Sequence, residues 1–207
     1  MSFPAIILAG GKSKRMGRDK ATIEINGVPL ITHVIDNLKL AGCKKVIIQI
    51  KSKQQQINLA PLISGVEITW GFDNEDNGGV VEALYCALKI AKVKNWKVVQ
   101  LVPIDTPYVN PNFFKKINKM LDENLDVLIP SSNSSKEGHS NGLEPLLSFL
   151  KVEPVLSEIL KFGNNKKRRL GEIFCETNYK IITQNQWEKW GVSKISFKNL
   201  NYPNDLE

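Results

Sequence analysis

The sequence has few of the residues that bind structural metals or form cross-links. Its 207 residues include three cysteines and two histidines. Cys43, Cys86 and Cys175 lie far apart, in none of the paired spacings that are typical of zinc sites or disulfide frameworks. We therefore expect the cysteines to be reduced thiols in a cytoplasmic protein.

Long apolar runs are missing as well. Runs such as residues 5–8 are only a few residues long, whereas a membrane-spanning helix needs about 20. No basic segment precedes an apolar core near the start, which argues against a secretion signal. No internal repeat is evident, and the one low-complexity stretch is the polar segment 131–140. These absences predict a protein that neither enters a membrane nor is secreted.

The net charge of +7 is concentrated in two segments. Residues 12–20 contain five basic residues and one acid, and residues 161–169 contain five basic residues and no acid. The remainder of the chain is close to neutral. Such clusters suit phosphate groups or nucleic acid, and the alternative is that both are solvated surface. The content of 42% hydrophobic and 24% charged residues is typical of a folded globular protein.

Short segments rich in valine and isoleucine alternate with helical patterns over the first 130 residues. Apolar residues recur at four-residue spacing between Pro29 and Gly42, which predicts a helix with proline at its start and glycine at its end. Further helices are expected over 79–92 and 112–121. The alternation predicts an α/β fold of three layers (α/β/α) with a mostly parallel, doubly wound sheet. The expected strands are 5–8, 46–50, 66–69, 97–102 and 126–129.

The alternation weakens after the polar segment. A helix is expected over 153–162, between three further strand candidates. We interpret this region as folding back onto the same sheet, so that residues 1–207 form a single domain. Its N-terminal part is about 1–130 and its C-terminal part about 140–207. The later strand candidates are 146–150, 178–183 and 195–200.

A glycine-rich loop with several cations follows the first expected strand. Adjacent glycines allow a sharp turn that brings backbone N–H groups to an anion, and open α/β sheets bind ligands where strands end. The loop is neither a Walker motif nor a dinucleotide fingerprint, because Ile6 and Lys12 occupy required glycine positions. A polyphosphate site and a flexible basic loop are the two interpretations. The loop reads Leu8-Ala9-Gly10-Gly11-Lys12-Ser13-Lys14-Arg15-Met16-Gly17-Arg18-Asp19-Lys20.

This loop resembles the nucleotide-binding signature of the molybdenum cofactor guanylyltransferases. That family belongs to the nucleotidyltransferases of glycosyltransferase-like fold, also called the nucleotide-diphospho-sugar transferase fold. The resemblance implies backbone contacts to GTP around the glycines, an arginine that faces the phosphates and a lysine that contacts the GTP. The residues concerned are Leu8, Ala9, Gly10, Gly11, Arg15 and Lys20.

A second motif, residues 103–107, follows the fourth expected strand. It resembles the family's Pro-x-Asp-x-Pro segment, which implies that Asp105 holds Mg²⁺ and acts in catalysis with Arg15 and Lys20. A carboxylate suits Mg²⁺, which prefers one or two carboxylates together with phosphate oxygens and water. The alternative is an aspartate that starts a turn before Pro107.

Guanine offers an N1–H and an exocyclic amine, and an ionised carboxylate can accept from both. Asp73, shortly after the third expected strand, resembles the family's base-reading aspartate, and Asp76 is the reserve candidate. Gln49 falls where the family commonly has an asparagine that contacts the nucleotide, and its arm is longer. A departure from the family lies at 78–82, where Glu82 replaces a small residue.

The second half resembles the family in three segments. Glu144 begins a Glu-Pro-Leu segment like one that opens a later family strand. Arg168 and Arg169 resemble a Gly-x-Arg-Arg segment and suit the phosphate of the acceptor, although a solvated helix is the alternative. Asn199 and Asn201 resemble asparagines that the family links to the pterin side of the site.

Together these resemblances imply transfer of GMP from MgGTP to molybdopterin, with or without its metal, and release of pyrophosphate. The N-terminal part would bind GTP and the C-terminal part would complete the acceptor site. The partners implied are GTP, molybdopterin and proteins that deliver or receive the cofactor, without nucleic acid or membrane. The alternatives are a related transferase that uses CTP or another nucleotide, or a sugar or organic phosphate acceptor, a nucleic-acid-binding module, and a non-catalytic paralogue.

Overall fold

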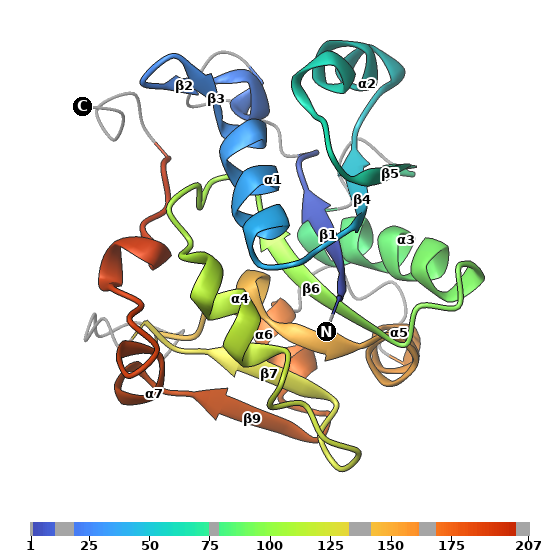
Figure 1. Ribbon diagram of the computed structural model, residues 1–207. Helices are drawn as coiled ribbons and strands as arrows, with labels where there is room; N and C mark the ends of the chain where they lie inside the picture. The colour runs from blue at the N-terminus through green and yellow to red at the C-terminus, as the bar shows by residue number, and fades with distance from the viewer. Residues whose placement is uncertain (1, 11–18, 75–78, 133–141, 162–168, 202–207) are drawn as a thin grey trace.

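A seven-stranded mixed sheet forms the centre of the molecule (Figure 1). The computed structural model describes residues 2–10, 19–74, 79–132, 142–161 and 169–201. Within them the strand order is β5-β4-β1-β6-β8-β7-β9, and only β8 runs antiparallel to its neighbours. The strands are β1 (Pro4–Leu8), β4 (Lys45–Ile50), β5 (Glu67–Phe72), β6 (Val98–Pro103), β7 (Val127–Pro130), β8 (Phe149–Lys151) and β9 (Tyr179–Ile182).

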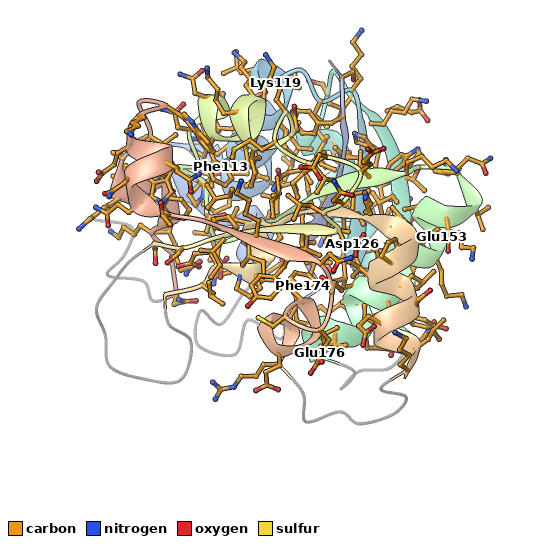
Figure 2. The ribbon with its side chains drawn as sticks, turned by 90° about the horizontal axis from the view of Figure 1, so that it is seen from below. Phe113, Lys119, Asp126, Glu153, Phe174 and Glu176 are labelled. Carbon is orange, nitrogen blue, oxygen red and sulfur yellow. The ribbon has the colours of Figure 1, made fainter. Side chains whose placement is uncertain are left out.

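Helices cover both faces of this sheet, because successive strand residues point to opposite faces. Ile7 packs into the core beneath α1, α2, α4 and α7, whereas Ile6 packs into the opposite core beneath α3, α5 and α6. Figure 2 shows Phe113 and Phe174 on opposite sides of the sheet. The predicted three-layer α/β/α fold is confirmed. The helices are α1 (Leu30–Leu40), α2 (Lys53–Leu59), α3 (Gly79–Val93), α4 (Pro111–Ile117), α5 (Val152–Lys161), α6 (Leu170–Phe174) and α7 (Gln184–Glu188).

The elements predicted for the first half are confirmed within a few residues, with one correction. Helix α1 starts after Pro29 and is followed by Gly42 at a φ of +97°, as the sequence predicts. Helix α4, however, ends at Ile117 rather than near residue 121. The next two backbone bonds span three residues, which tightens the chain into turns, and Asp122 then accepts from two backbone N–H groups.

Two of the later strand predictions need correction. In the segment predicted as strand 146–150, Pro145 starts the 3₁₀ helix η3 (Pro145–Leu147), and the strand itself is β8. Residues 195–200, another predicted strand, contain the 3₁₀ helix η4 (Lys194–Phe197). Ser196 and Phe197 are both buried there, which an alternating strand on one face of a sheet cannot achieve. The predicted strand 178–183 is confirmed as β9.

Several short elements were not predicted. A hairpin of β2 (Glu24–Ile25) and β3 (Val28–Pro29) turns at Asn26-Gly27, which both have positive φ, and Asn-Gly is the sequence that such turns favour. Helices α2, α6 and α7 are seven residues or shorter. The 3₁₀ helices η1 (Lys20–Thr22) and η2 (Ala60–Leu62) complete the described elements.

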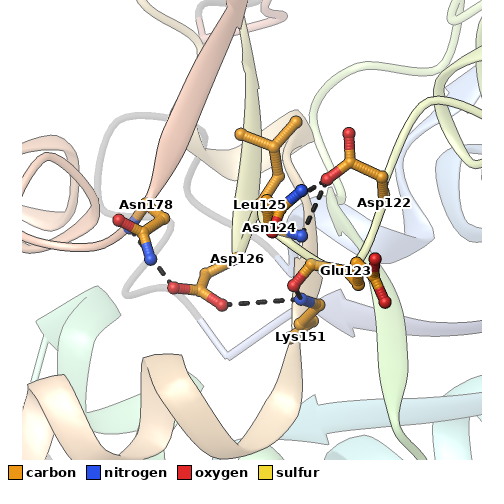
Figure 3. Close-up of polar contacts among 7 residues, drawn as sticks. All are labelled: Asp122, Glu123, Asn124, Leu125, Asp126, Lys151 and Asn178. Carbon is orange, nitrogen blue, oxygen red and sulfur yellow. Dashed lines mark hydrogen bonds and ion pairs between the residues drawn. The ribbon is translucent and has the colours of Figure 1, made fainter.

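The C-terminal strands are tied to the rest of the sheet by a polar network at the start of β7 (Figure 3). The Asp126 carboxylate accepts from the Asn178 backbone N–H at 3.3 Å and pairs with Lys151 at 3.7 Å. The Lys151 ammonium also donates to the Glu123 carbonyl at 2.7 Å. These bonds join β7, β8 and the entry to β9 at the edge of the sheet where β7 begins.

Trp187 anchors α7 to this end of the sheet. Its side chain is fully buried, and its indole N–H donates to the Ser131 carbonyl at 2.9 Å. Its ring also packs against Phe197, with centroids 4.9 Å apart.

We expect Trp187→Phe to lower the free energy of unfolding by about 1–3 kcal/mol, because it removes the donor to a buried carbonyl while keeping an aromatic ring. Urea denaturation followed by circular dichroism measures the loss. Trp96→Phe is the matched control, since Trp96 is only partly buried against the opposite core. Equal losses in the two variants would contradict the importance of the indole bond.

Candidate functional site

Four strands end at one level along the sheet. Leu8 pairs with Gln49 on one side and with Pro103 on the other, and Gln49 pairs with Gly71. Because β5, β4, β1 and β6 are parallel, the residues that follow this row all emerge at the same edge. Ligands of open α/β sheets bind at this edge. Most of the predicted site residues that the structure describes lie here.

The start of the glycine-rich loop has a fixed backbone. Ala9 is buried, and its N–H donates to the Gln49 carbonyl at 2.9 Å. Its carbonyl accepts from the Gln55 side-chain amide at 2.9 Å. Gln55 belongs to α2, which was not predicted, so the sequence gave no indication of this contact. The loop therefore leaves β1 in one defined direction toward Gly10.

Asp73 lies directly against Gly10. A side chain at residue 10 would collide with the Asp73 carboxylate, so the glycine makes this close approach possible. One carboxylate oxygen of Asp73 accepts from the Gln49 side-chain N–H at 2.9 Å. The three residues predicted to meet the base, from three different strand ends, are thus in contact. We call Gly10, Gln49 and Asp73 the base cluster.

The Asp73 carboxyl has an unusual electrostatic environment. Burial raises its pKa above the ordinary value of 3.8, the hydrogen bond from Gln49 opposes that shift, and the nearby Glu82 carboxylate adds to it. Glu82 is in the first turn of α3, where it accepts from the Asn74 side-chain N–H at 3.3 Å. The departure from the family pattern at Glu82 therefore places a second carboxylate beside Asp73.

A second group of residues gathers at the end of β6. The Lys20 ammonium pairs with the Asp105 carboxylate at 2.9 Å and donates to the Asn201 side-chain oxygen at 2.9 Å. All three residues are partly exposed. We call Lys20, Asp105 and Asn201 the cation cluster. Asn201, which the resemblance links to the pterin, in fact contacts the lysine predicted to bind GTP.

The C-terminal segment reaches the cation cluster through a small core of its own. Leu200 is fully buried among Ile23, Ile25 and Leu30, with Tyr108 beside them. Its backbone N–H donates to the Asp105 carbonyl at 2.9 Å. This bond fixes the next residue, Asn201, beside the Asp105 side chain.

Glu144 is a further carboxylate at the same edge. Its backbone N–H donates to the Pro130 carbonyl at 2.8 Å, at the end of β7. Burial raises the pKa of Glu144, a hydrogen bond with Ser132 opposes that shift, and the Asp105 carboxylate adds to it. The sequence analysis noted the Glu-Pro-Leu segment but gave Glu144 no role. The strand order, with β8 between β6 and β7, is what places it near Asp105.

The remaining predicted residues are placed as follows. Leu8 ends β1 and is half-buried, and Asn199 is exposed two residues before Asn201. Arg169 is exposed at the start of α6, where its backbone N–H donates to Glu172 at 3.2 Å. Four predicted or reserve residues lie outside the described residues: Gly11, Arg15, Asp76 and Arg168.

The cation cluster has the donor set that suits Mg²⁺. Asp105 offers a carboxylate and Asn201 a carbonyl oxygen, and both already converge on one cationic group, the Lys20 ammonium. Across the described ranges, no group of three or more His, Cys, Asp or Glu side chains could hold a metal ion by itself. Such a site fits an ion that takes one or two carboxylates and completes its shell with phosphate oxygens and water.

The two clusters flank the end of β1 and offer complementary chemistry. The base cluster presents a carboxylate to neutral hydrogen-bond donors, whereas the cation cluster presents an ammonium group and oxygen ligands to phosphates. A nucleoside triphosphate has both kinds of group at its two ends.

Comparison with known proteins agrees with this arrangement. The family model for the MobA-like NTP transferase domain matches residues 5–177. The chain belongs to this family. The predicted assignment to the nucleotidyltransferases is therefore confirmed for this MobA-like chain.

Two relatives of this MobA-like chain are similar over nearly all of it. A probable molybdenum cofactor guanylyltransferase from Pyrococcus horikoshii is 32% identical over 100% of this chain and 98% of the relative. A molybdenum cofactor guanylyltransferase from Vibrio cholerae is 28% identical over 97% of this chain and 88% of the relative.

A solved structure supports the fold of the MobA-like chain. Molybdopterin-guanine dinucleotide biosynthesis protein A from Archaeoglobus fulgidus superposes with a TM-score of 0.74 at 22% identity, covering 99% of this chain and 95% of that one. The predicted nucleotide-diphospho-sugar transferase fold is confirmed by this likeness. In the part of the chain that the structure describes, no helix is long and apolar enough to cross a bilayer.

The raised pKa of Asp73 predicts a pH-dependent stability difference. A carboxyl whose pKa is raised on folding favours the protonated form, so its contribution to stability is lost as pH rises through the folded-state pKa. Asp73→Asn should therefore gain melting temperature relative to the unaltered protein as pH rises above about 4. Thermal unfolding at a series of pH values measures this difference.

Asp36→Asn is the comparison for the loss of one carboxylate, because Asp36 is exposed on α1. Its difference from the unaltered protein should stay nearly constant over the same pH range. An Asp73→Asn difference that stays equally flat would contradict the assignment of a desolvated carboxylate.

Proposed function

We propose that the protein transfers GMP from GTP to the phosphate of molybdopterin and releases pyrophosphate. The observation that carries the proposal is the placement of the base cluster and the cation cluster on either side of the β1 end. The names of the relatives, molybdenum cofactor guanylyltransferases, support the identity of the two substrates.

In this proposal the base cluster binds guanine. The Asp73 carboxylate accepts from the N1–H and the exocyclic amine, two donors that adenine does not present together. Gly10 lets the carboxylate and the loop backbone approach each other, so the base and the first phosphates lie along one continuous surface. Gln49 donates to the carboxylate oxygen that lies nearer the sheet.

The cation cluster binds the phosphates. Lys20 would offset the charge on the α-phosphate and on the leaving pyrophosphate, and Arg15 would act with it. Asp105, with the side-chain oxygen of Asn201, would hold Mg²⁺, whose charge stabilises the phosphate oxygens when it is bound. The Leu200 backbone bond keeps Asp105 and Asn201 in register for this task.

The reaction needs no nucleophile from the protein. An oxygen of the acceptor phosphate, which is largely ionised at pH 7, forms the new bond to the α-phosphorus of GTP. The bond from that phosphorus to the bridging oxygen breaks, and its electron pair leaves with pyrophosphate. The protein's contribution is to align the two phosphates and neutralise their charge. Arg168 and Arg169 would hold the acceptor phosphate, and Asn199 would lie on the pterin side.

A panel of nucleotides tests the donor substrate. Thermal shift with GTP, CTP, UTP and ATP in the presence of Mg²⁺ should show the largest stabilisation with GTP. A larger shift with CTP would favour the related cytidylyl transfer instead. Salt-sensitive binding to mixed oligonucleotides without any GTP shift would indicate a nucleic-acid-binding module.

A variant of Asp105 tests the reaction. We expect Asp105→Ala to lower pyrophosphate release with GTP and molybdopterin by a factor of at least about 100, since one preorganised charged group is lost. Pyrophosphate release under saturating GTP and Mg²⁺ is the measurement.

Asp126→Ala is the matched control for Asp105→Ala. Asp126 is also a partly buried aspartate paired with a lysine, but it lies at the opposite edge of the sheet, where β7 begins. Asp126→Ala should reduce stability without abolishing transfer. Full transfer activity in Asp105→Ala would overturn the proposed role of Asp105.

A further inference from the structure

Gln49 is a buried polar side chain at the base cluster. It is the next-to-last residue of β4, and none of its surface is exposed. Its side-chain N–H donates to Asp73 at 2.9 Å. Its side-chain oxygen has no hydrogen-bond partner among the described residues. A buried amide with an unpaired oxygen is costly for folding, so its presence calls for an explanation outside stability.

Gly71 lies across the strand pair from Gln49 and makes room for it. The two residues are register partners in β4 and β5. A Cβ atom on Gly71 would overlap the Gln49 side-chain oxygen and would lie 2.9 Å from the Ile90 Cδ1 atom. Gly71 is not among the glycines with positive φ, so it is the space, and not the backbone conformation, that requires glycine.

The longer arm of glutamine has a geometric purpose in this arrangement. The side chain extends over Gly71 and reaches the Asp73 carboxylate, whose other oxygen is held against Gly10. An asparagine at residue 49 is one methylene shorter and would leave Asp73 without this donor. Asp73 is therefore held from two sides, by an amide on one side and by the glycine backbone on the other.

We propose that Gln49 is a positioning residue that orients the Asp73 carboxylate for guanine, and that Gly71 provides the space this requires. The proposal rests on the proposed guanylyl transfer. Gln49 itself, being fully buried, reaches the base only through Asp73. The Gln49 hydrogen bond also lowers the pKa of Asp73, against burial and the Glu82 carboxylate of α3, and so favours the ionised form that guanine needs.

Gln49→Met tests the proposal, because methionine has nearly the same length and shape but no polar atoms. The measurements are the melting temperature and the dissociation constants of MgGTP and MgATP by calorimetry between pH 5.5 and 8, conditions set at roughly one pH unit around the range where a raised carboxyl titrates. We expect a melting temperature close to that of the unaltered protein, since the unpaired oxygen is also removed. GTP should bind about tenfold or more weakly, with ATP binding unchanged.

The pH dependence gives a readout that a purely structural role would not change. The midpoint of the loss of GTP binding at low pH should move upward in Gln49→Met, because Asp73 has lost a donor that favours its ionised form. The charged or titratable groups that face Asp73, Glu82 and Cys86 of α3, are unaltered in this variant.

Gln56→Met is the matched control. Gln56, in α2, also has a buried side-chain oxygen without a partner among the described residues, but it has no hydrogen bond to the base cluster. This variant should keep the GTP preference and the pH midpoint of the unaltered protein. A Gln49→Met protein that behaves like Gln56→Met would overturn the positioning role.

Gly71→Ala tests the other half of the proposal. Its methyl group should displace the Gln49 side chain and reduce the GTP preference as Gln49→Met does. Adding Gln49→Asn should recover part of the melting temperature, because the shorter arm leaves room for the methyl group, but not the GTP preference. Full GTP preference in Gly71→Ala would overturn the assignment to Gly71.

The failure of the proposed function gives a different result. If the unaltered protein binds GTP no better than ATP, guanylyl transfer is overturned, and the role of Gln49 in guanine binding falls with it. If the unaltered protein prefers GTP and Gln49→Met retains that preference, only the positioning role is overturned.

Discussion

The parallel pairing of β5, β4, β1 and β6 is the constraint on which the site depends. Hydrogen bonding fixes the register, so Gly71, Gln49, Leu8 and Pro103 form one row across four strands. A shift of one residue in any pair would turn each side chain of that strand to the other face of the sheet. The closeness of Asp73 to Gly10, and of Asp105 to the loop after β1, is therefore a consequence of how the hydrophobic strands pack, and needs no separate device.

The two clusters manage charge in opposite ways. Asp105 is paired with a lysine, whereas Asp73 is held by a neutral amide and has a second carboxylate nearby. An uncompensated carboxylate is a strong acceptor for a neutral donor such as a base edge, because it has no competing cation. A lysine next to oxygen ligands suits phosphates, which need positive charge. The division of labour between the clusters thus follows from the partners that each carboxylate lacks or has.

The sequence alone predicts the layered fold and most of the edge on which the site lies, because the strands near residues 5–8, 46–50 and 97–102 are strongly apolar and well separated by helices. It does not predict the contacts that complete the site. Asn201 meets Lys20 only because Leu200 packs into a separate small core, and Glu144 nears Asp105 only through the insertion of β8. Both depend on long-range packing, to which local periodicity is blind. The short 3₁₀ helix at 194–197 was mistaken for a strand for the same reason.

The hydrogen bond between Lys20 and Asn201 joins residues that are 181 positions apart in the chain. Closing so large a loop costs more conformational entropy than pairing neighbouring strands, and contacts of this kind slow folding. The sheet and its two helical layers can therefore assemble while the cation cluster is still open. A partly folded chain would already have the base cluster and a native-like core, yet it would lack the arrangement that holds phosphates. Competence for catalysis is then acquired in the final step of folding, separately from the appearance of secondary structure.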